Sequence, residues 1–499
     1  MLQVISNLIP RASYHKKKFM TQYIPKLKPV VALAIALLSV GGYHAVAQEK
    51  ISLQKAVDLT LERNLTIKQA LITESLATAD YEQAKNNRLP SASATPQGSY
   101  NFGRSVNQAT YSYTNQSSLY VSGSASVSVT LFQGGILRNQ ILQNKLVLDA
   151  DKSNTAKIKN DLVLNVVTDY LQILTNQDLV IAAKQQIDIA NQNLSKVDIS
   201  VKVGNQTLAD LAQAKAQLST ATLNLTTAQN QLDLSILILK QYMEMAPGTD
   251  IAVEKPDISH LTDVKTYYDA NEVIKTALNV NPDVKLAEAQ QATSAQAIKV
   301  AKGGFYPSVS LFAGAGSSYS NLLNQQLIGT NLVTEQIGVV QGTNQIVQTI
   351  APQPIYGPYS AFSQISNNFN QSIGVNVQIP IFSKFSNRTN VSKAKLNYQN
   401  AQISSQIAKN NLSKTIIQAI LDLQAADKQF QSARETYQSN KEALNVTKQR
   451  YDVGLVNTLD YNTALTNYNK SQNDMIEAQY AVIFRSKVID YYLGNTITL

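Results

Sequence analysis

The sequence predicts an internally duplicated chain that combines the strands of a membrane β-barrel with very long α-helices paired as coiled coils. Three observations predict this mixed fold class: residues recur at constant spacing, some short stretches alternate apolar and polar residues, and two long stretches contain almost no Gly or Pro. Alternation with a period of two is typical of a strand between lipid and a wet lumen. Long stretches without helix breakers are typical of long helices.

The duplication is visible as residues that recur at a fixed displacement. The displacement is 217 positions near the start of each repeat and 250 positions further along, so one insertion of 33 residues in the second repeat accounts for the difference. The insertion lies between Pro307 and Val377. Matched pairs include Asn64 with Asn281, Pro90 with Pro307, Phe132 with Phe382, Arg138 with Arg388, Gly204 with Gly454, Asp210 with Asp460 and Tyr242 with Tyr492.

The first 47 residues are predicted to be a signal peptide. They hold six Lys and Arg residues and no acidic residue, then the apolar run from Val30 to Val40 and the small-x-small motif Ala45–Ala47. The apolar run is too short to span a bilayer, which takes roughly 20 residues. The Lys16–Lys18 run has an alternative interpretation as a nucleic-acid or nuclear-targeting patch, but the apolar run that follows favours the signal peptide, and no nucleic-acid partner is expected.

Charge and composition argue against catalysis. Removal of the signal peptide lowers the net charge from +9 to about +3, because 37 Lys and Arg residues then stand against 34 acidic residues. The mature chain has no Cys and keeps His260 as its only His, which leaves no thiol chemistry and no His-based metal site. No nucleophile and base pair or phosphate-binding loop stands out, so we expect no enzyme, no cofactor and no metal.

Each repeat is expected to contain two strands. Leu119–Leu131 and Ile373–Ile381 alternate apolar residues with small polar ones, and shorter strands are expected at Ser91–Phe102 and Ser308–Tyr319, each beginning beside a Pro that ends the preceding helix. An ordinary half-buried strand of a soluble sheet shows the same alternation, so the pattern alone leaves both interpretations open. In the membrane interpretation, four strands leave two unpaired edges that hydrocarbon does not tolerate. Neighbouring chains must then close the barrel, with two chains giving eight strands or three giving twelve.

Two long helices follow the strands, at Leu137–Val203 and Asn387–Val453. Each would be roughly 100 Å long as a continuous helix. After a turn, the chain returns in a helix with large residues every seven positions and small residues between them, which predicts an antiparallel coiled-coil hairpin. These large residues are Leu211, Leu218, Leu225, Leu232 and Leu239 in the first repeat, and Tyr461, Tyr468, Met475 and Val482 in the second.

These features resemble the TolC family of outer-membrane factors over about residues 50 to 494: the duplicated helix-strand-strand-helix-helix unit, the signal peptide, the Phe305–Pro307 motif that enters a strand, and the glycine-bearing hairpin tips. The resemblance implies a homotrimer with a 12-stranded barrel and a 12-helix periplasmic tunnel, in the outer membrane of a Gram-negative bacterium. It implies a passive exit conduit of a tripartite efflux or type I secretion system. The implied partners are outer-membrane lipid, a periplasmic adaptor (membrane fusion) protein and an inner-membrane transporter of RND, ABC or MFS type. Some family members carry a lipid on a Cys, and this chain has no Cys.

The resemblance also suggests functional positions at the hairpin tips. Asp460 matches an acidic ring that favours cations at the closed periplasmic mouth, and Asp210 and Tyr451 match partners in the contacts that hold that mouth shut. Thr463 stands where the family can have a second acidic residue, and Val456 stands where it often has a gating Arg. The expected adaptor-docking residues are Val203, Gly204, Asn205, Val453, Gly454 and Leu455.

Simpler explanations exist for the same tip residues. Thr207 with Asp210, and Asn457 with Asp460, have the spacing of a helix N-cap with an acid three residues later, which stabilises a helix start without any further role. Gly204 and Gly454 are residues that permit a tight turn out of a helix. For the whole chain, the alternative to a duct is a secreted or periplasmic coiled-coil structural protein without a pore.

We therefore divide the chain into a signal peptide (1–47), a first repeat (48–245), an inter-repeat linker in an equatorial belt (246–271), a second repeat (272–494) and a short tail (495–499). The extra residues of the second repeat fall at about 321–368, in an outer strand-to-strand loop. This segment is expected to be a surface lid or a contact site for external agents, or otherwise a plain long loop.

Overall fold

The computed structural model describes residues 49–107, 112–256 and 265–495, so the predicted signal peptide and His260 lie outside the described residues. Strands β1 (Glu49–Ile51) and β6 (Ile251–Val253) form a small two-stranded sheet. Among the described residues, no helix combines the length and the apolar character needed to cross a membrane. Residues 51–249 and those from 253 onward belong to one unit, which contains the long helices and the larger sheet.

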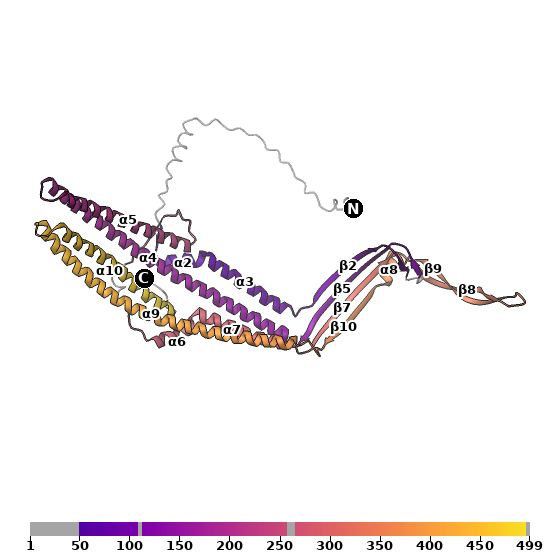
Figure 1. The fold of residues 1–499 in the computed structure, drawn as a ribbon. Coiled ribbons are helices and arrows are strands. Elements are labelled where there is room, and N and C mark those ends of the chain that lie inside the picture. Colours follow the sequence, from indigo (N-terminus) through magenta and orange to yellow (C-terminus); the bar gives the residue numbers. More distant parts are fainter. Residues whose placement is uncertain (1–48, 108–111, 257–264, 496–499) are drawn as a thin grey trace, which may run out of the picture. The chain divides into compact units, whose positions relative to one another are not determined.

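The two repeats have the same order of elements, except that the second has an additional short helix, α8, before its last strand (Figure 1). The first contains α2 (Leu53–Arg63), α3 (Leu65–Asn86), β2 (Ser91–Asn101), β3 (Ser105–Asn107), β4 (Ser112–Thr114), β5 (Ser118–Gln133), α4 (Ile136–Lys202) and α5 (Leu208–Tyr242). The second contains α6 (Ala270–Val280), α7 (Pro282–Gly303), β7 (Ser308–Ser320), β8 (Gln325–Val339), β9 (Ile346–Pro358), α8 (Ala361–Asn367), β10 (Asn370–Gln378), α9 (Ser386–Asp452) and α10 (Thr458–Leu493).

Four strands form one antiparallel sheet in the order β10-β7-β5-β2, with two strands from each repeat. The repeats join where β5 pairs with β7, and β2 and β10 are the edges. Residues in register give the two faces of the sheet different chemical characters, although Phe312 lies on the polar one. One row across the sheet is Ala92, Val127, Ala313 and Ile373, and the adjacent row on the other face is Ser93, Ser126, Gly314 and Ser372.

The polar face is rich in hydroxyl groups and has no formal charge. The Ser93 and Ser126 hydroxyl oxygens lie 3.0 Å apart across the strands, and those of Ser91 and Ser128 lie 3.1 Å apart. None of the four strands contains Asp, Glu, Lys or Arg. On the opposite face, Val127 is 43% exposed and Val375 is 58% exposed in the single chain. The sheet therefore has an uncharged polar face and an exposed apolar face, the two surfaces that a barrel wall between water and lipid requires.

The turn from sheet to long helix has the same backbone in both repeats. Gly134 and Gly135 have positive φ angles of 56° and 75°, and a Cβ added at Gly134 would lie 2.3 Å from the Gly303 carbonyl oxygen. The equivalent positions of the second repeat, displaced by 250, are Lys384 and Phe385 rather than glycines. They have the same left-handed backbone, with φ angles of 52° and 61°. Left-handed backbone is costly for residues with a Cβ. The second repeat nevertheless keeps this turn without glycine.

Helices α4 and α9 each contain 67 residues, and each begins and ends within one residue of the predicted boundary. Helix α5 packs along α4, and α10 packs along α9, which confirms the predicted hairpins. In α5 the buried residues Ala214, Ala221 and Leu239 belong to the predicted seven-residue seam, while most of the helix is exposed. Helix α10 is more buried, because it also packs against α4 and α6.

Shorter helices fill the space beside the long ones. Helices α2 and α3 pack on α4, and α7 packs on both α4 and α9. Helix α6 packs on α9 and α10, where Val273, Ile416, Leu423 and Ile489 belong to one buried hydrophobic cluster. Near the middle of α4, the buried Tyr170 hydroxyl lies 3.1 Å from the Ile51 carbonyl oxygen and 2.6 Å from that of Glu254. This hydroxyl ties α4 to the start of the first repeat and to the inter-repeat linker.

The structure corrects the sequence analysis in two places. Strand β10 ends at Gln378 rather than continuing to Ile381, because Pro380 cannot donate to the ladder and restricts the residue before it. The segment 321–368 is not a plain long loop, since it contains the β8–β9 hairpin and helix α8. Its many Val, Ile and Thr residues favour strands, and this composition was not recognised from the sequence.

Candidate functional site: the two hairpin tips

Both long helices end in the same C-cap. Gly204 and Gly454 have φ angles of 80° and 78°, a conformation that favours glycine. The following amides close the cap, since Asn205 N donates to Ser200 O at 2.8 Å and Leu455 N donates to Arg450 O at 2.8 Å. This six-to-one bond is that of a Schellman motif, which satisfies carbonyl groups at a helix end. The tip glycines therefore have a structural role that would exist without any partner.

The returning helices begin with different uses of their acidic residue. At the start of α5, the Thr207 hydroxyl accepts a bond from Asp210 N at 3.2 Å, and the Asp210 carboxylate accepts from Thr207 N at 3.0 Å, which completes a capping box. At the start of α10, the Asn457 side chain accepts from Asp460 N at 2.8 Å. No donor among the described residues lies within bonding distance of the Asp460 carboxylate, so only Asp210 has its carboxylate engaged in capping.

The Asp210 carboxylate also links the two hairpins. Its hydrogen bonds with Thr207 and with Thr458, which precedes Asp460 by two positions on α10, lower the pKa of Asp210 below its usual value. A lowered pKa keeps the carboxylate charged at neutral pH. Thr463, one turn beyond Asp460, donates its hydroxyl to Leu459 O at 2.8 Å and so has no free donor to offer a neighbour.

Two further contacts join the tips of the two hairpins in one chain. Gln206 Nε2 donates to the Tyr451 hydroxyl at 3.0 Å, and Lys196 forms an ion pair with Asp452 at 2.8 Å. The ring of Tyr451 stacks on that of Tyr461, with centroids 4.8 Å apart and planes 11° apart. The structure thus brings Asp210 and Tyr451 into the same contact region. Each meets the other hairpin through a different residue, and no hydrogen bond joins the two directly.

Sequence reasoning did not find Gln206, Lys196, Asp452 or Thr458. These residues have no distinctive spacing, and their contacts exist only because two helices far apart in the sequence meet. The outer surface of each tip is apolar: Val203 is 64% exposed, Val453 is 69% exposed and Leu455 is 71% exposed, so these predicted docking residues are available for contact. Leu208 and Leu459, which were not predicted, extend the same surface with exposed fractions of 76% and 63%.

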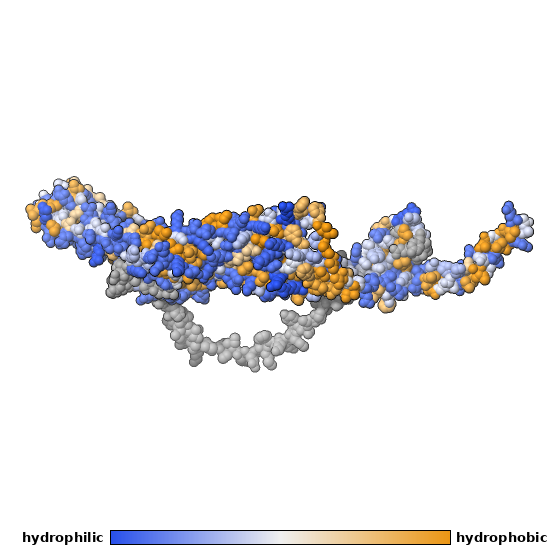
Figure 2. Space-filling model, turned by 90° about the horizontal axis from the view of Figure 1, so that it is seen from below, coloured by the Kyte–Doolittle hydropathy of each residue, from blue (hydrophilic) through white to orange (hydrophobic). Residues whose placement is uncertain are grey.

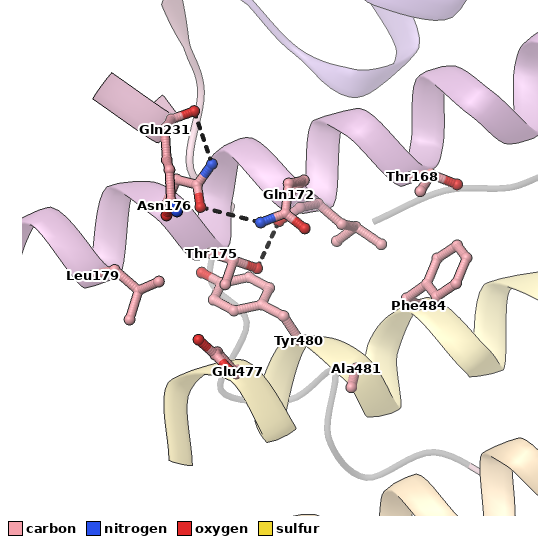
Figure 3. A pocket seen from close by; sticks show the side chains of 11 residues that line it. Thr168, Gln172, Thr175, Asn176, Leu179, Gln231, Glu477, Tyr480, Ala481 and Phe484 are labelled. Atoms are coloured by element: carbon pink, nitrogen blue, oxygen red, sulfur yellow. Dashed lines mark hydrogen bonds between the residues drawn. The ribbon is translucent and has the colours of Figure 1, made fainter. Parts of the chain in front are cut away.

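A cavity with both polar and apolar lining lies midway along the helices, between α4, α5 and α10 (Figure 3). Its volume is about 350 Å³. Amide side chains dominate one wall, where Gln172 Nε2 donates to Asn176 Oδ1 and Asn176 Nδ2 donates to the Gln231 carbonyl, both at 3.1 Å. On the other wall, the Tyr480 hydroxyl donates to Asp178 at 2.8 Å, and Asp178 pairs with Lys255 of the linker. Burial, and next the bond to Asp178, raise the pKa of Tyr480, so the phenol stays neutral.

One acidic residue on α4 has no compensating partner. Asp169 Oδ2 is buried and has no hydrogen-bond partner within the described part of the chain, and burial raises the pKa of Asp169 to about 6. No pattern in the sequence distinguishes this Asp from the others on α4. Across residues 49–107, 112–256 and 265–495, no three His, Asp or Glu side chains are grouped so that they could hold a metal ion.

Comparison with known proteins places this arrangement among channels. The family model described as outer membrane efflux protein matches residues 56–243 and 273–495, one block for each repeat. Outer membrane protein TolC of Salmonella enteritidis is 20% identical over 475 residues, which covers 94% of this chain and 87% of that protein.

Solved structures show the same fold. The CusC structure, from a study of folding and transmembrane channel formation, superposes with a TM-score of 0.72 at 16% identity, covering 89% of this chain and 92% of CusC. The Campylobacter jejuni CmeC outer membrane channel superposes with a TM-score of 0.71 at 20% identity, covering 89% of this chain and 85% of CmeC. These similarities confirm the predicted fold class of barrel strands joined to a helical tunnel.

Proposed function

Because this chain belongs to the outer membrane efflux protein family, we propose that three copies assemble into the outer-membrane exit duct of an export machine. Each copy contributes four strands to one barrel and two helical hairpins to the tunnel below it. Family membership confirms the efflux-duct function and the outer-membrane location predicted from the sequence. The matched proteins are channels rather than enzymes, and the family favours a duct over a structural coiled coil without a pore.

The observation that carries the assembly is the open sheet. Strands β2 and β10 are paired on one side each, and each leaves a row of backbone donors and acceptors unpaired. Such edges are not tolerated in hydrocarbon, where no water can satisfy them. Pairing β2 of one copy with β10 of the next closes the barrel and uses the same contact at every interface, as cyclic symmetry requires. Three copies give twelve strands, the number implied by the family.

The hairpin tips are proposed as the gate of the duct. The contacts of Gln206 with Tyr451, Lys196 with Asp452 and Asp210 with Thr458 hold the two hairpins of one chain together, and separating the hairpins requires all three to break. Each contact is individually weak because it is partly exposed. A gate of this kind can open without large cost once a partner binds one of the hairpins.

The partners of the tips are proposed to be a periplasmic adaptor and, through it, an inner-membrane transporter. The exposed apolar side chains at the tips support this proposal, since clustered apolar side chains at an end of a molecule are typical of contact sites. Asp460, whose carboxylate is free of capping, is proposed to supply one charge per copy to a ring at the tunnel mouth. Three carboxylates in one ring would favour cations.

The proposal is tested by purifying the protein from membranes in detergent and measuring mass and conductance. We expect a particle with the mass of three chains that forms ion-conducting pores in a planar bilayer. A chain that stays in aqueous solution without detergent, as a monomer and with no conductance, would overturn the duct and favour the structural coiled coil.

A further inference from the structure

The β8–β9 hairpin is an isolated ribbon with an unusual composition. Its strands pair with each other and with no other strand among the described residues. Across residues 321–368, Glu335 is the only charged residue. Two-stranded hairpins are marginally stable in water when nothing packs on them, and a long uncharged hairpin is prone to associate. We therefore expect the hairpin to pack against another surface.

The register places six exposed large apolar side chains on one face, whereas Val333, Val347 and Ile355 lie on the other. Cross-strand pairs on this face include Leu332 with Pro352 and Val339 with Ile346, while Glu335 with Thr349 lies on the other face. We call the first surface the hairpin apolar face, and its members are all exposed. They are Leu327 (61% exposed), Leu332 (74%), Val339 (52%), Ile346 (57%), Ile350 (69%) and Tyr356 (45%). In the space-filling view of Figure 2, the hairpin extends at the right and carries hydrophobic patches with hydrophilic residues between them.

The outer edge of β9 is closed to further strands. Pro352 and Pro354 stand at alternate positions and therefore turn their backbone nitrogens to the same side. The β8–β9 ladder continues past both residues, so the missing N–H groups belong to the outer row. Proline in this row prevents the addition of another strand. A partner would therefore contact the hairpin through its apolar face rather than extend it at this edge.

The base of the hairpin is held on the barrel sheet by α8. Gln364 is almost fully buried, accepts a bond from Ser320 N at 2.9 Å and donates to Leu323 O at 2.7 Å. Asn368 Nδ2 donates to Ser318 O at 2.8 Å, and the Ser317 hydroxyl donates to Ile365 O at 2.6 Å. Since β7 lies inside the sheet, every copy in a closed barrel would hold its hairpin at an equivalent place on the same rim.

We propose that the hairpin apolar faces of the three subunits pack against one another at the outer opening of the duct. This inference rests on the proposed trimer. Tethering to one rim gives the hairpins an effective concentration on the order of millimolar, which favours contact without any additional affinity. The lack of charge on the apolar face removes the repulsion that would otherwise oppose contact between identical surfaces. The absence of Lys and Arg from residues 321–368 argues against anionic lipid headgroups as the occupant.

The test uses single cysteines, because the chain has none of its own. Ile350→Cys places a thiol on the hairpin apolar face, and Thr349→Cys, its neighbour in sequence, places one on the opposite face. Each variant is reconstituted in nanodiscs that hold one assembly and treated with an oxidant or a short bismaleimide. We expect covalent dimers of the chain from Ile350→Cys, and several-fold fewer from Thr349→Cys. Equal yields, or no dimers from either variant, would overturn the proposal.

A second pair of variants separates this inference from the proposed function. Added to Ile350→Cys, Leu332→Asp puts a charge on the hairpin apolar face and should abolish cross-linking, while Glu335→Gln on the other face should leave it unchanged. The mass of each assembly is measured in the same samples. A trimer without face-dependent cross-linking contradicts the hairpin contact alone. A monomer contradicts the proposed duct as well.

Discussion

Asp169 shows how one side chain can make stability depend on pH. The carboxylate is partly buried without a hydrogen-bond partner at Oδ2, and its pKa is about 6 in the folded chain, against about 3.9 for an unfolded Asp. The folded state therefore binds a proton more tightly than the unfolded state. The stability linked to this proton is fully present below about pH 4 and is lost as the pH rises through about 6.

We expect Asp169→Asn to stabilise the protein at pH 7.5 and to have little effect at pH 4. The gain at the higher pH should be on the order of 1 kcal/mol, once the shift is discounted for the partial exposure of the group. Thermal unfolding in detergent at the two pH values measures it. Asp188→Asn, at an exposed position on the same helix, is the matched control and should change neither midpoint. A gain of equal size at both pH values would rule out proton linkage.

The proposed charge role of Asp460 can be tested separately from helix capping. The N-cap of α10 is the Asn457 side chain, and the Asp460 carboxylate has no part in that cap. Asp460→Asn should therefore keep the helix start intact while removing one charge per copy from the proposed ring. We expect a lower preference for cations in single-channel recordings, measured as a shift of the reversal potential in a salt gradient. Asp210→Asn, which disrupts a capping box, should instead loosen the tip and increase the open time.

At the scale of elements, the contact between the two hairpins is unusually polar. Helices α4 and α10 pack together, and each carries buried amide groups that lack a hydrogen-bond partner within the described residues. Both polar side-chain atoms of Asn462 are in this state, as are Gln186 Nε2 and Asn193 Nδ2 on α4. Besides the bond of the Tyr480 hydroxyl to Asp178, the helices are joined by a long bond of 3.3 Å from Gln472 Nε2 to Gln185 Oε1. A buried polar group without a partner costs roughly 1–3 kcal/mol, so this contact is weaker than its burial indicates.

We expect Asn462→Leu to strengthen the contact, because it replaces two unsatisfied polar atoms with an apolar side chain. The thermal midpoint should rise and the channel should open less often, as measured by thermal unfolding and by single-channel recording. Asn467→Leu, at an exposed position on the same helix, should affect neither quantity. A lower midpoint for Asn462→Leu would show that the amide has partners in the assembled duct.

At the scale of the whole molecule, the same substitution should have different effects on the two faces of the barrel sheet. Ser126 lies on the hydroxyl-lined face and Val127 on the apolar face of the central strand β5. Ser126→Lys in every copy should leave assembly intact and reduce cation preference in planar bilayers, because a ring of positive charge then lines the lumen.

Val127→Lys is the matched variant for the lipid face. A charge there costs about 2–4 kcal/mol at the bilayer midplane, so the yield of assembled protein in the membrane should fall. Loss of assembly from the serine variant, with normal assembly from the valine variant, would reverse the assignment of the two faces.

Local patterns were sufficient for much of the architecture. The stretches without Gly or Pro and the alternating strands depend on neighbouring residues, so they predicted α4, α9, β2, β5 and β7 closely, and the displacement of 250 positions related the two repeats. The tip glycines were recognisable for the same reason, since a helix that must reverse needs a left-handed residue at that position.

The sequence by itself therefore determined the repeat, the lengths of the helices, the two-faced strands and the turns, because these depend on backbone geometry and periodicity along the chain. Only the tertiary structure decided that Gln206 meets Tyr451, that Lys196 pairs with Asp452, and that Asp169 and Asn462 are buried without partners. These facts depend on how helices far apart in the sequence approach one another, as in the contact between Asp178 and Tyr480 over 302 positions. Burial and pairing are properties of that approach, and no single stretch of sequence contains them.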